Sequence, residues 1–207
     1  MGSRFYFSLM GCVLILFASS CRQKQTTLPD PHLSYAQVIQ KQRNDQQAYF
    51  AGEGSPLSDS ARANFKGLQF YPIDSSYRVS GNFSPIANGP IFTMQATGDV
   101  ADIYQIAGNI QFKLKDTICM LEVYRNVTYY QVEHKESYFV PFYDKTNGQE
   151  TYEGGRYLDV HKLQPGAMQL DFNLAYQPYC FYSHNYSCPI PPRVNSLPVY
   201  VRAGERK

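Results

Sequence analysis

The chain has 207 residues, and its 19 basic and 17 acidic side chains leave a formal net charge of +2. This length suffices for one domain with its own hydrophobic core. A nearly neutral chain lacks the basic surface that binds nucleic acid, so we expect no nucleic-acid partner. The 18 tyrosines, the absence of tryptophan and the short alternating runs described below favour a β-rich protein.

The first stretch of the chain, residues 1–20, has the features of an export signal. Arg4 provides a positive charge near the start, and the apolar run over residues 5–17 is too short for a permanent membrane-spanning helix. Small residues at 18–20 precede Cys21, an arrangement that resembles a bacterial lipobox. We therefore expect cleavage before Cys21 and attachment of acyl chains such as palmitate to this cysteine. Cleavage that leaves Cys21 unmodified, and retention of the leader as an anchor, remain alternatives.

Beyond the leader, the chain is expected to divide into a tether and a folded part. Residues 21–32 are polar, contain two prolines and lack periodicity, which predicts a lipid-attached tether. Residues 33–207 are expected to form a single mainly-β domain. The lipid would hold the protein on a membrane of a bacterial cell envelope, with the domain facing the periplasm or the exterior. The membrane is thus one expected partner.

One helix is expected near the start of this domain, over residues 34–50. Ser34 and Gln37 have the spacing of a capping box. Helical periodicity places the larger apolar side chains on one face, opposite Gln, Lys, Arg and Asp: Tyr35, Val38, Ile39, Tyr49 and Phe50. A helix packed on a sheet is the favoured interpretation, and a partner-binding helix is the alternative.

From residue 68 onward the hydrophobic period changes to two, which predicts strands. The expected strands are 77–83, 91–96, 101–107, 110–114, 117–125, 137–145, 156–160, 168–172 and 199–203. Gly108-Asn109 and Asn147-Gly148 each predict a two-residue hairpin turn, and the second would place Lys145 opposite Glu150. Short connections favour antiparallel pairing. The predicted fold is a mainly-β antiparallel sandwich or open barrel, with the N-terminal helix packed against it.

A set of short motifs extends over the C-terminal third of the chain. It includes Phe142-Tyr143-Asp144, Gly155-Arg156-Tyr157-Leu158-Asp159, Asp171-Phe172-Asn173, Cys188-Pro189 and Ala203-Gly204-Glu205. With matching motifs upstream, the pattern covers about residues 35–205. Through these motifs the chain resembles an uncharacterised prokaryotic family, domain of unknown function family 1684. The resemblance implies no established reaction, cofactor or ligand, and Leu174, Gln177 and His184 depart from the family pattern.

Cys180 and Cys188 lie eight positions apart in a chain that is expected to be exported. A disulfide between them would stabilise the domain by about 2–3 kcal/mol, mostly by restricting the unfolded chain. Two buried free thiols are the main alternative. Cys180, His184 and Cys188 could also supply three zinc ligands, but no fourth ligand is evident in the sequence, so we expect no metal.

A second group of polar residues could form either a ligand site or a structural network: Asp144, Arg156, Asp159, Asp171, Asn173 and Tyr176. An arginine beside carboxylates and tyrosines could receive an anionic or sugar-like ligand, or two carboxylates could share acid and base roles. In the favoured structural interpretation, Arg156 pairs with an aspartate, while Asp171 and Asn173 hold the following loop. No motif of an activated nucleophile or a phosphate loop accompanies the group.

The proline-rich loop near the C-terminus carries several aromatic side chains: Tyr179, Phe181, Tyr182 and Tyr186. It could be a recognition surface or a lid over one end of the sheet. Together these features favour an envelope lipoprotein that binds a small ligand or an envelope protein, with neither a cofactor nor catalysis. The alternative is a hydrolase that uses Asp144, Asp159 or Asp171 in a cleft with Arg156.

Overall fold

The computed structural model describes residues 33–127, 137–161 and 163–207, and Leu33–Lys207 form one compact unit. The expected leader, Cys21 and the expected tether all lie outside the described residues. Within the described part of the chain, no helix is both long and apolar enough to cross a bilayer.

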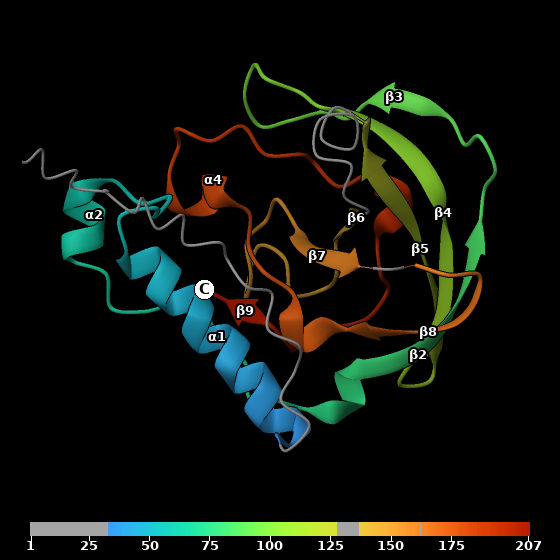
Figure 1. Cartoon of the computed structure of the whole chain (residues 1–207), viewed down its shortest axis with the longest axis horizontal. Coiled ribbons are helices and arrows are strands. Elements are labelled where there is room, and N and C mark those ends of the chain that lie inside the picture. The colour runs from blue at the N-terminus through green and yellow to red at the C-terminus, as the bar shows by residue number, and fades with distance from the viewer. Residues whose placement is uncertain (1–32, 128–136, 162) are drawn as a thin grey trace, which may run out of the picture. The chain divides into compact units, whose positions relative to one another are not determined.

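Most of the described strands belong to one antiparallel sheet (Figure 1). Its order is β7-β6-β5-β4-β2-β8, and β3 pairs with β4 beside this path. The bounds of its strands are β2 Arg78–Pro85, β3 Ile91–Thr93, β4 Ile103–Leu114, β5 Thr117–Asn126, β6 Ser137–Phe142, β7 Arg156–His161 and β8 Gly166–Asp171. A second pairing joins β1 Gln69–Phe70 to β9 Glu205–Arg206, next to the C-terminus.

The main sheet curls into an antiparallel half-barrel with one long helix at its N-terminal side. The predicted mainly-β fold is therefore confirmed, and of the two architectures left open, the curled sheet matches the open barrel. Alternation along the strands explains the core, because every second side chain faces the same side of a strand. On β4 the side chains that belong to the main core are Ile110, Phe112 and Leu114, and on the neighbouring β5 they include Leu121 and Val123.

Helix α1 spans Tyr35–Ala51, close to the predicted bounds. The predicted capping box is confirmed: the Gln37 N–H donates to the Ser34 hydroxyl, and the Ser34 N–H donates to the Gln37 side chain at 2.8 Å. The other helical segments that the structure describes in full are short: α2 Asp59–Ala63, α4 Tyr179–Tyr182 and the 3-10 turns η1 Ser75–Tyr77, η2 Phe172–Leu174 and η3 Arg193–Asn195.

The inner face of α1 carries a buried arginine that the hydrophobic pattern did not reveal. Arg43 lies between Ile39 and Phe50 on the buried face of the helix. Its Nη1 donates to the carbonyl oxygen of Tyr71 at 2.9 Å, and its guanidinium lies 4.7 Å from the centre of the Phe70 ring. The helix is thus fastened to the rest of the domain by polar contacts as well as by apolar packing.

The expected hairpin turn at Gly108-Asn109 is wrong, because β4 continues straight through these residues. The pairing of β4 with β5 shifts its register between Ile106 and Gly108, as it does at a β-bulge. A Cβ atom at Gly108 would lie closer than 3.0 Å to the Ser84 carbonyl oxygen on β2. Glycine marks a close approach of two strands here rather than a turn, so the expected strands 101–107 and 110–114 form one strand.

The predicted two-residue hairpin at Asn147-Gly148 is also wrong. β6 ends at Phe142, and a compact loop follows in which the Asn147 side chain donates to the Tyr152 carbonyl oxygen at 2.9 Å. Lys145 and Glu150 do not pair across a hairpin: the Lys145 N–H donates to the carbonyl oxygen of Val199, and the Glu150 N–H donates to that of Thr146. Side-chain hydrogen bonds over several residues, rather than turn propensity, determine this loop.

The strand expected at 199–203 is wrong as well, although buried and exposed residues alternate along this segment. Val201 and Ala203 have no exposed surface. Their carbonyl oxygens accept hydrogen bonds from the Arg156 guanidinium instead of a neighbouring strand, and the ladder with β1 begins only at Glu205. A side chain that lies 45 or more positions away thus replaces a strand partner.

Glu205 follows this segment, and its side chain has no exposed surface. It accepts hydrogen bonds from the Gln177 N–H and the Tyr182 hydroxyl, both at 2.8 Å, and from the Gln46 side chain. Burial nevertheless raises the pKa of Glu205 from its ordinary 4.5 to about 7, because desolvation of the charged form outweighs these hydrogen bonds.

We expect Glu205→Gln to remove a pH-dependent part of the stability. A carboxyl whose pKa is higher in the folded state stabilises the fold fully below its unfolded pKa, and this stability is lost as the pH rises through about 7. The free energy of unfolding of the variant, relative to the wild type, should therefore rise by up to about 3 kcal/mol between pH 4.5 and pH 8. Urea denaturation across this range measures the difference. Glu153→Gln, at an exposed site, is the matched control, and a pH-independent difference for Glu205→Gln would contradict the assignment.

Candidate functional site

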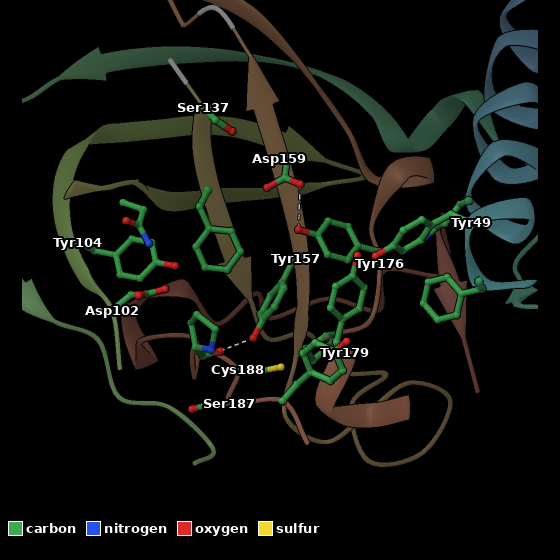
Figure 2. A pocket seen from close by; sticks show the side chains of 17 residues that line it. Tyr49, Asp102, Tyr104, Ser137, Tyr157, Asp159, Tyr176, Tyr179, Ser187 and Cys188 are labelled. Atoms are coloured by element: carbon green, nitrogen blue, oxygen red, sulfur yellow. Dashed lines mark hydrogen bonds between the residues drawn. The ribbon is translucent and has the colours of Figure 1, made fainter. Parts of the chain in front are cut away.

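A cavity of about 590 Å³ opens beside β6 and β7 and is lined by 17 residues (Figure 2). β7 provides Tyr157 and Asp159, two positions apart and therefore on the same side of the strand. The start of β4, the end of α1, α4 and the loop up to Pro189 provide the other walls. Eight of the 17 lining residues are aromatic: Tyr49, Phe50, Tyr104, Phe139, Tyr157, Tyr176, Tyr179 and Tyr186.

The aromatic rings that line the cavity meet mostly edge to face, so neighbouring ring planes are steeply inclined to one another. The rings of Tyr157 and Tyr176 lie 5.7 Å apart with an angle of 89° between their planes. Phe139 packs against Tyr157 at 4.7 Å and 75°, and Tyr179 packs against Tyr186 at 5.3 Å and 69°. Such pairs stabilise one another beyond simple burial, which gives the cavity preformed walls.

Asp159 is the carboxylate on the β7 wall, and its side chain is open to the cavity. The Tyr176 hydroxyl donates to Asp159 Oδ2 at 2.9 Å, as Figure 2 shows. The surrounding protein reduces hydration of the carboxylate, and this desolvation raises the pKa of Asp159. The hydrogen bond from Tyr176 and the charge of His161 act in the opposite direction. A charged Asp159 is therefore only partly compensated by its neighbours.

Asp102, just before β4, is a second exposed carboxylate of the cavity. It lies beside Tyr104, whose pKa is raised to about 12, mainly by burial and further by the charges of Asp102 and Asp159. Neither aspartate forms a salt bridge with any described residue. Among the described residues that line the cavity there is no Lys, Arg or His.

The six polar residues predicted as one group separate into three places. The first is the buried pair of Asp144 and Arg156, whose side chains have no exposed surface and approach to 2.8 Å. Arg156 also donates to the carbonyl oxygens of Val201, Ala203 and Glu205. Because all of these contacts are internal, Arg156 has no free face for an anionic ligand, and its geometry matches the structural interpretation.

The second place joins Asp171 and Asn173 to helix α1. The Tyr35 hydroxyl donates to Asp171 Oδ2 at 2.9 Å, and the Asn173 side chain donates to the Tyr35 hydroxyl and to the Asp74 carbonyl oxygen. This arrangement holds the turn after β8 against the start of α1. Only the third place, Asp159 with Tyr176, lines the cavity.

The two cysteines of the C-terminal loop lie next to each other as buried free thiols. The Cys180 N–H donates to Cys188 Sγ at 3.1 Å, and contact with the Cys188 thiol lowers the pKa of Cys180 to about 6. A lowered thiol pKa favours oxidation, and the two cysteines lie in contact. The Cys180–Cys188 disulfide stays a prediction, which this proximity makes geometrically reasonable. His184 does not complete a metal site with them, as no group of three or more potential ligands occurs in the described part of the chain.

Sequence reasoning identified the cavity residues of the C-terminal part of the chain but did not identify those near β4. Tyr176, Tyr179 and Asp159 were singled out because they belong to a motif-rich stretch, whereas Asp102 and Tyr104 were not. Asp102 and Tyr104 come from the start of β4 and the residue before it, more than 50 positions earlier in the chain. The only local signal was their spacing of two, which places both side chains on one side of an extended chain.

Comparisons with known proteins identify a family and a similar solved structure. The family model described as "Protein of unknown function (DUF1684)" matches residues 63–206. A solution NMR structure of an uncharacterised protein from Haloarcula marismortui is similar, with 34% sequence identity and a TM-score of 0.66, over 82% of this chain and 92% of the archaeal chain. No curated protein matches the chain. The chain thus belongs to the DUF1684 family.

Proposed function

We propose that this protein is an envelope lipoprotein whose β-domain binds a small organic ligand in the aromatic cavity, without catalysing a reaction. The observation that carries the proposal is the cavity itself. Its volume of about 590 Å³ is in the range of pockets that hold small molecules, and its lining combines many aromatic rings with a few polar groups.

The way the cavity is built also supports binding. Tyr157 and Asp159 stand on β7, the end strand of the main sheet, which pairs with β6 over six residues. Tyr157 is buried, and its hydroxyl donates to the Pro189 carbonyl oxygen. Side chains held in this way lose little freedom when a ligand arrives, which lowers the entropic cost of binding.

A titration of the purified protein with a library of small molecules, followed by NMR, tests this proposal. We expect at least one compound to shift the resonances of β6, β7 and α4. Ser137→Trp, which places a large side chain at the cavity wall, should weaken its binding by about tenfold or more. Ser84→Trp, on an exposed position of β2, is the matched control. A library that binds nowhere, or binding that Ser137→Trp leaves unchanged, would contradict the proposal.

The envelope location depends on the leader and on Cys21. We propose that acyl chains on Cys21 hold the protein to a membrane while the domain stays in the aqueous phase. The expected result is a mass of the native N-terminal peptide that equals residues from Cys21 onward plus acyl chains. Cys21→Ser should release the protein from the membrane fraction. An unmodified Cys21 in the native protein would refute the anchor.

The structure reduces the number of carboxylates that the alternative function, a hydrolase, could use. Of the three carboxylates considered for it, Asp144 and Asp171 are engaged in internal contacts, and Asp159 faces the cavity. A hydrolase would therefore have to use Asp159, whose raised pKa suits a general acid, together with Asp102. Turnover by the wild type that Asp159→Asn abolishes at unchanged melting temperature would favour this alternative over binding alone.

A further inference from the structure

We infer that the ligand of the aromatic cavity is an organic cation that carries a substituted ammonium group. This inference rests on the proposed binding function and names the chemical class of its ligand. It is carried by two independent observations, the sign of the charges in the cavity and the arrangement of its rings.

The charges of the cavity are of one sign. Asp159 and Asp102 both open into it, neither has a salt-bridge partner among the described residues, and no described basic side chain lines the walls. Two carboxylates without an ion-pair partner among the described residues give this hollow a negative potential. A cation in the cavity would balance this charge, whereas the described carboxylates would repel an anion. The buried position of Arg156 removes the group that could have favoured an anion.

The aromatic rings suit a cation with apolar substituents. Tyr157, Tyr176 and Phe139 meet at steep angles, and Tyr179 and Tyr186 form a second such pair. The labelled tyrosines surround the same hollow as Asp159 and Cys188 (Figure 2). Ring faces carry negative partial charge, and groups of rings at angles to one another bind quaternary ammonium groups in other proteins. A small inorganic cation would leave most of this apolar surface unused.

The test compares two ligands of equal shape and different charge. Choline and 3,3-dimethyl-1-butanol differ in the replacement of the ammonium nitrogen by carbon, so their difference in affinity reports on the charge. We expect NMR titrations of the purified protein at pH 8 to give a dissociation constant for choline at least about tenfold below that of the neutral compound. The shifted resonances should belong to β6, β7 and α4.

Three variants test which carboxylates account for the preference for choline. Asp159→Asn and Asp102→Asn should each weaken choline binding measurably, by up to about tenfold, and should change the affinity for 3,3-dimethyl-1-butanol much less. Asp116→Asn makes the same change of charge at the exposed turn between β4 and β5 and should leave both affinities unchanged. Equal melting temperatures of the four proteins exclude a loss of folding as the cause.

The outcomes separate this inference from the proposed function. Two results would contradict a cationic ligand and leave the proposed binding function standing. One is equal binding of choline and its neutral isostere. The other is binding of a neutral sugar such as methyl glucoside in preference to both. Choline binding that Asp159→Asn and Asp116→Asn reduce equally would also overturn it, because the effect would then come from the overall charge. If neither these compounds nor any member of the library binds, the proposed function fails as well.

Discussion

Replacement of Arg156 by methionine is expected to lower the free energy of unfolding by about 3–5 kcal/mol. The side chain is wholly buried and donates to Asp144 Oδ2 at 2.8 Å and to three carbonyl oxygens of the C-terminal segment. Methionine fills much of the volume but leaves a buried carboxylate without its counter-charge and the carbonyl oxygens without donors. In thermal unfolding, the midpoint should fall by roughly 6–20 °C for a domain of this size.

The matched control for this prediction is Arg202→Met. Arg202 is also paired with a carboxylate, since it binds Glu150 through three hydrogen bonds, but its side chain is 55% exposed. Water replaces the lost partner at such a site, so the unfolding midpoint should stay near that of the wild type. Similar losses for the two variants would mean that the buried network around Arg156 does not stabilise the domain.

Gly204→Ala is expected to destabilise the domain by about 3 kcal/mol or more. Gly204 has a φ of +74°, which alanine adopts only with strain. An added Cβ would also lie closer than 3.0 Å to the carbonyl oxygens of Ala175 and Phe172, and backbone atoms cannot move aside as a flexible side chain can. Both effects act on the segment that Arg156 holds in place. Urea denaturation of the variant measures the loss.

Gly166→Ala separates the two causes. Gly166, at the start of β8, has a φ of +96° but no atom within 4 Å of an added Cβ. This variant therefore carries the backbone strain alone, about 1–2 kcal/mol. A Gly204→Ala variant no less stable than Gly166→Ala would show that the C-terminal segment can shift to admit a methyl group, and that its packing is looser than the structure indicates.

These two predictions concern the C-terminal segment, which contacts residues next to and within the cavity wall. Glu205 follows Gly204 and accepts from Gln177 and Tyr182, beside the loop that carries Tyr176 and Tyr179. Gln46, which also donates to Glu205, lines the cavity itself. A displaced C-terminal segment would therefore disturb the cavity walls, so binding experiments belong on variants such as Asp159→Asn that leave this segment intact.

Local signals in the sequence determined the secondary structure where the stabilising contacts are themselves local. The capping box and the bounds of α1, the strands β2, β5 and β8, and the mainly-β class follow from periodicity of 3.6 or 2 and from residues within four positions of one another. The family motifs were likewise readable, and the family model matches residues 63–206, which is most of the stretch from about 35 to 205 that the motifs cover.

Only the tertiary structure decided what the exceptional residues do. Gly108 permits the close approach of β2 instead of a turn, and Arg156 bonds carbonyl oxygens 45 to 49 positions away. The cavity brings Asp102 and Tyr104 together with Asp159 and Tyr176. The physical reason is the same in each case: burial and hydrogen bonding across the curled sheet depend on partners far apart in the chain, and no local pattern records which side chain will meet which.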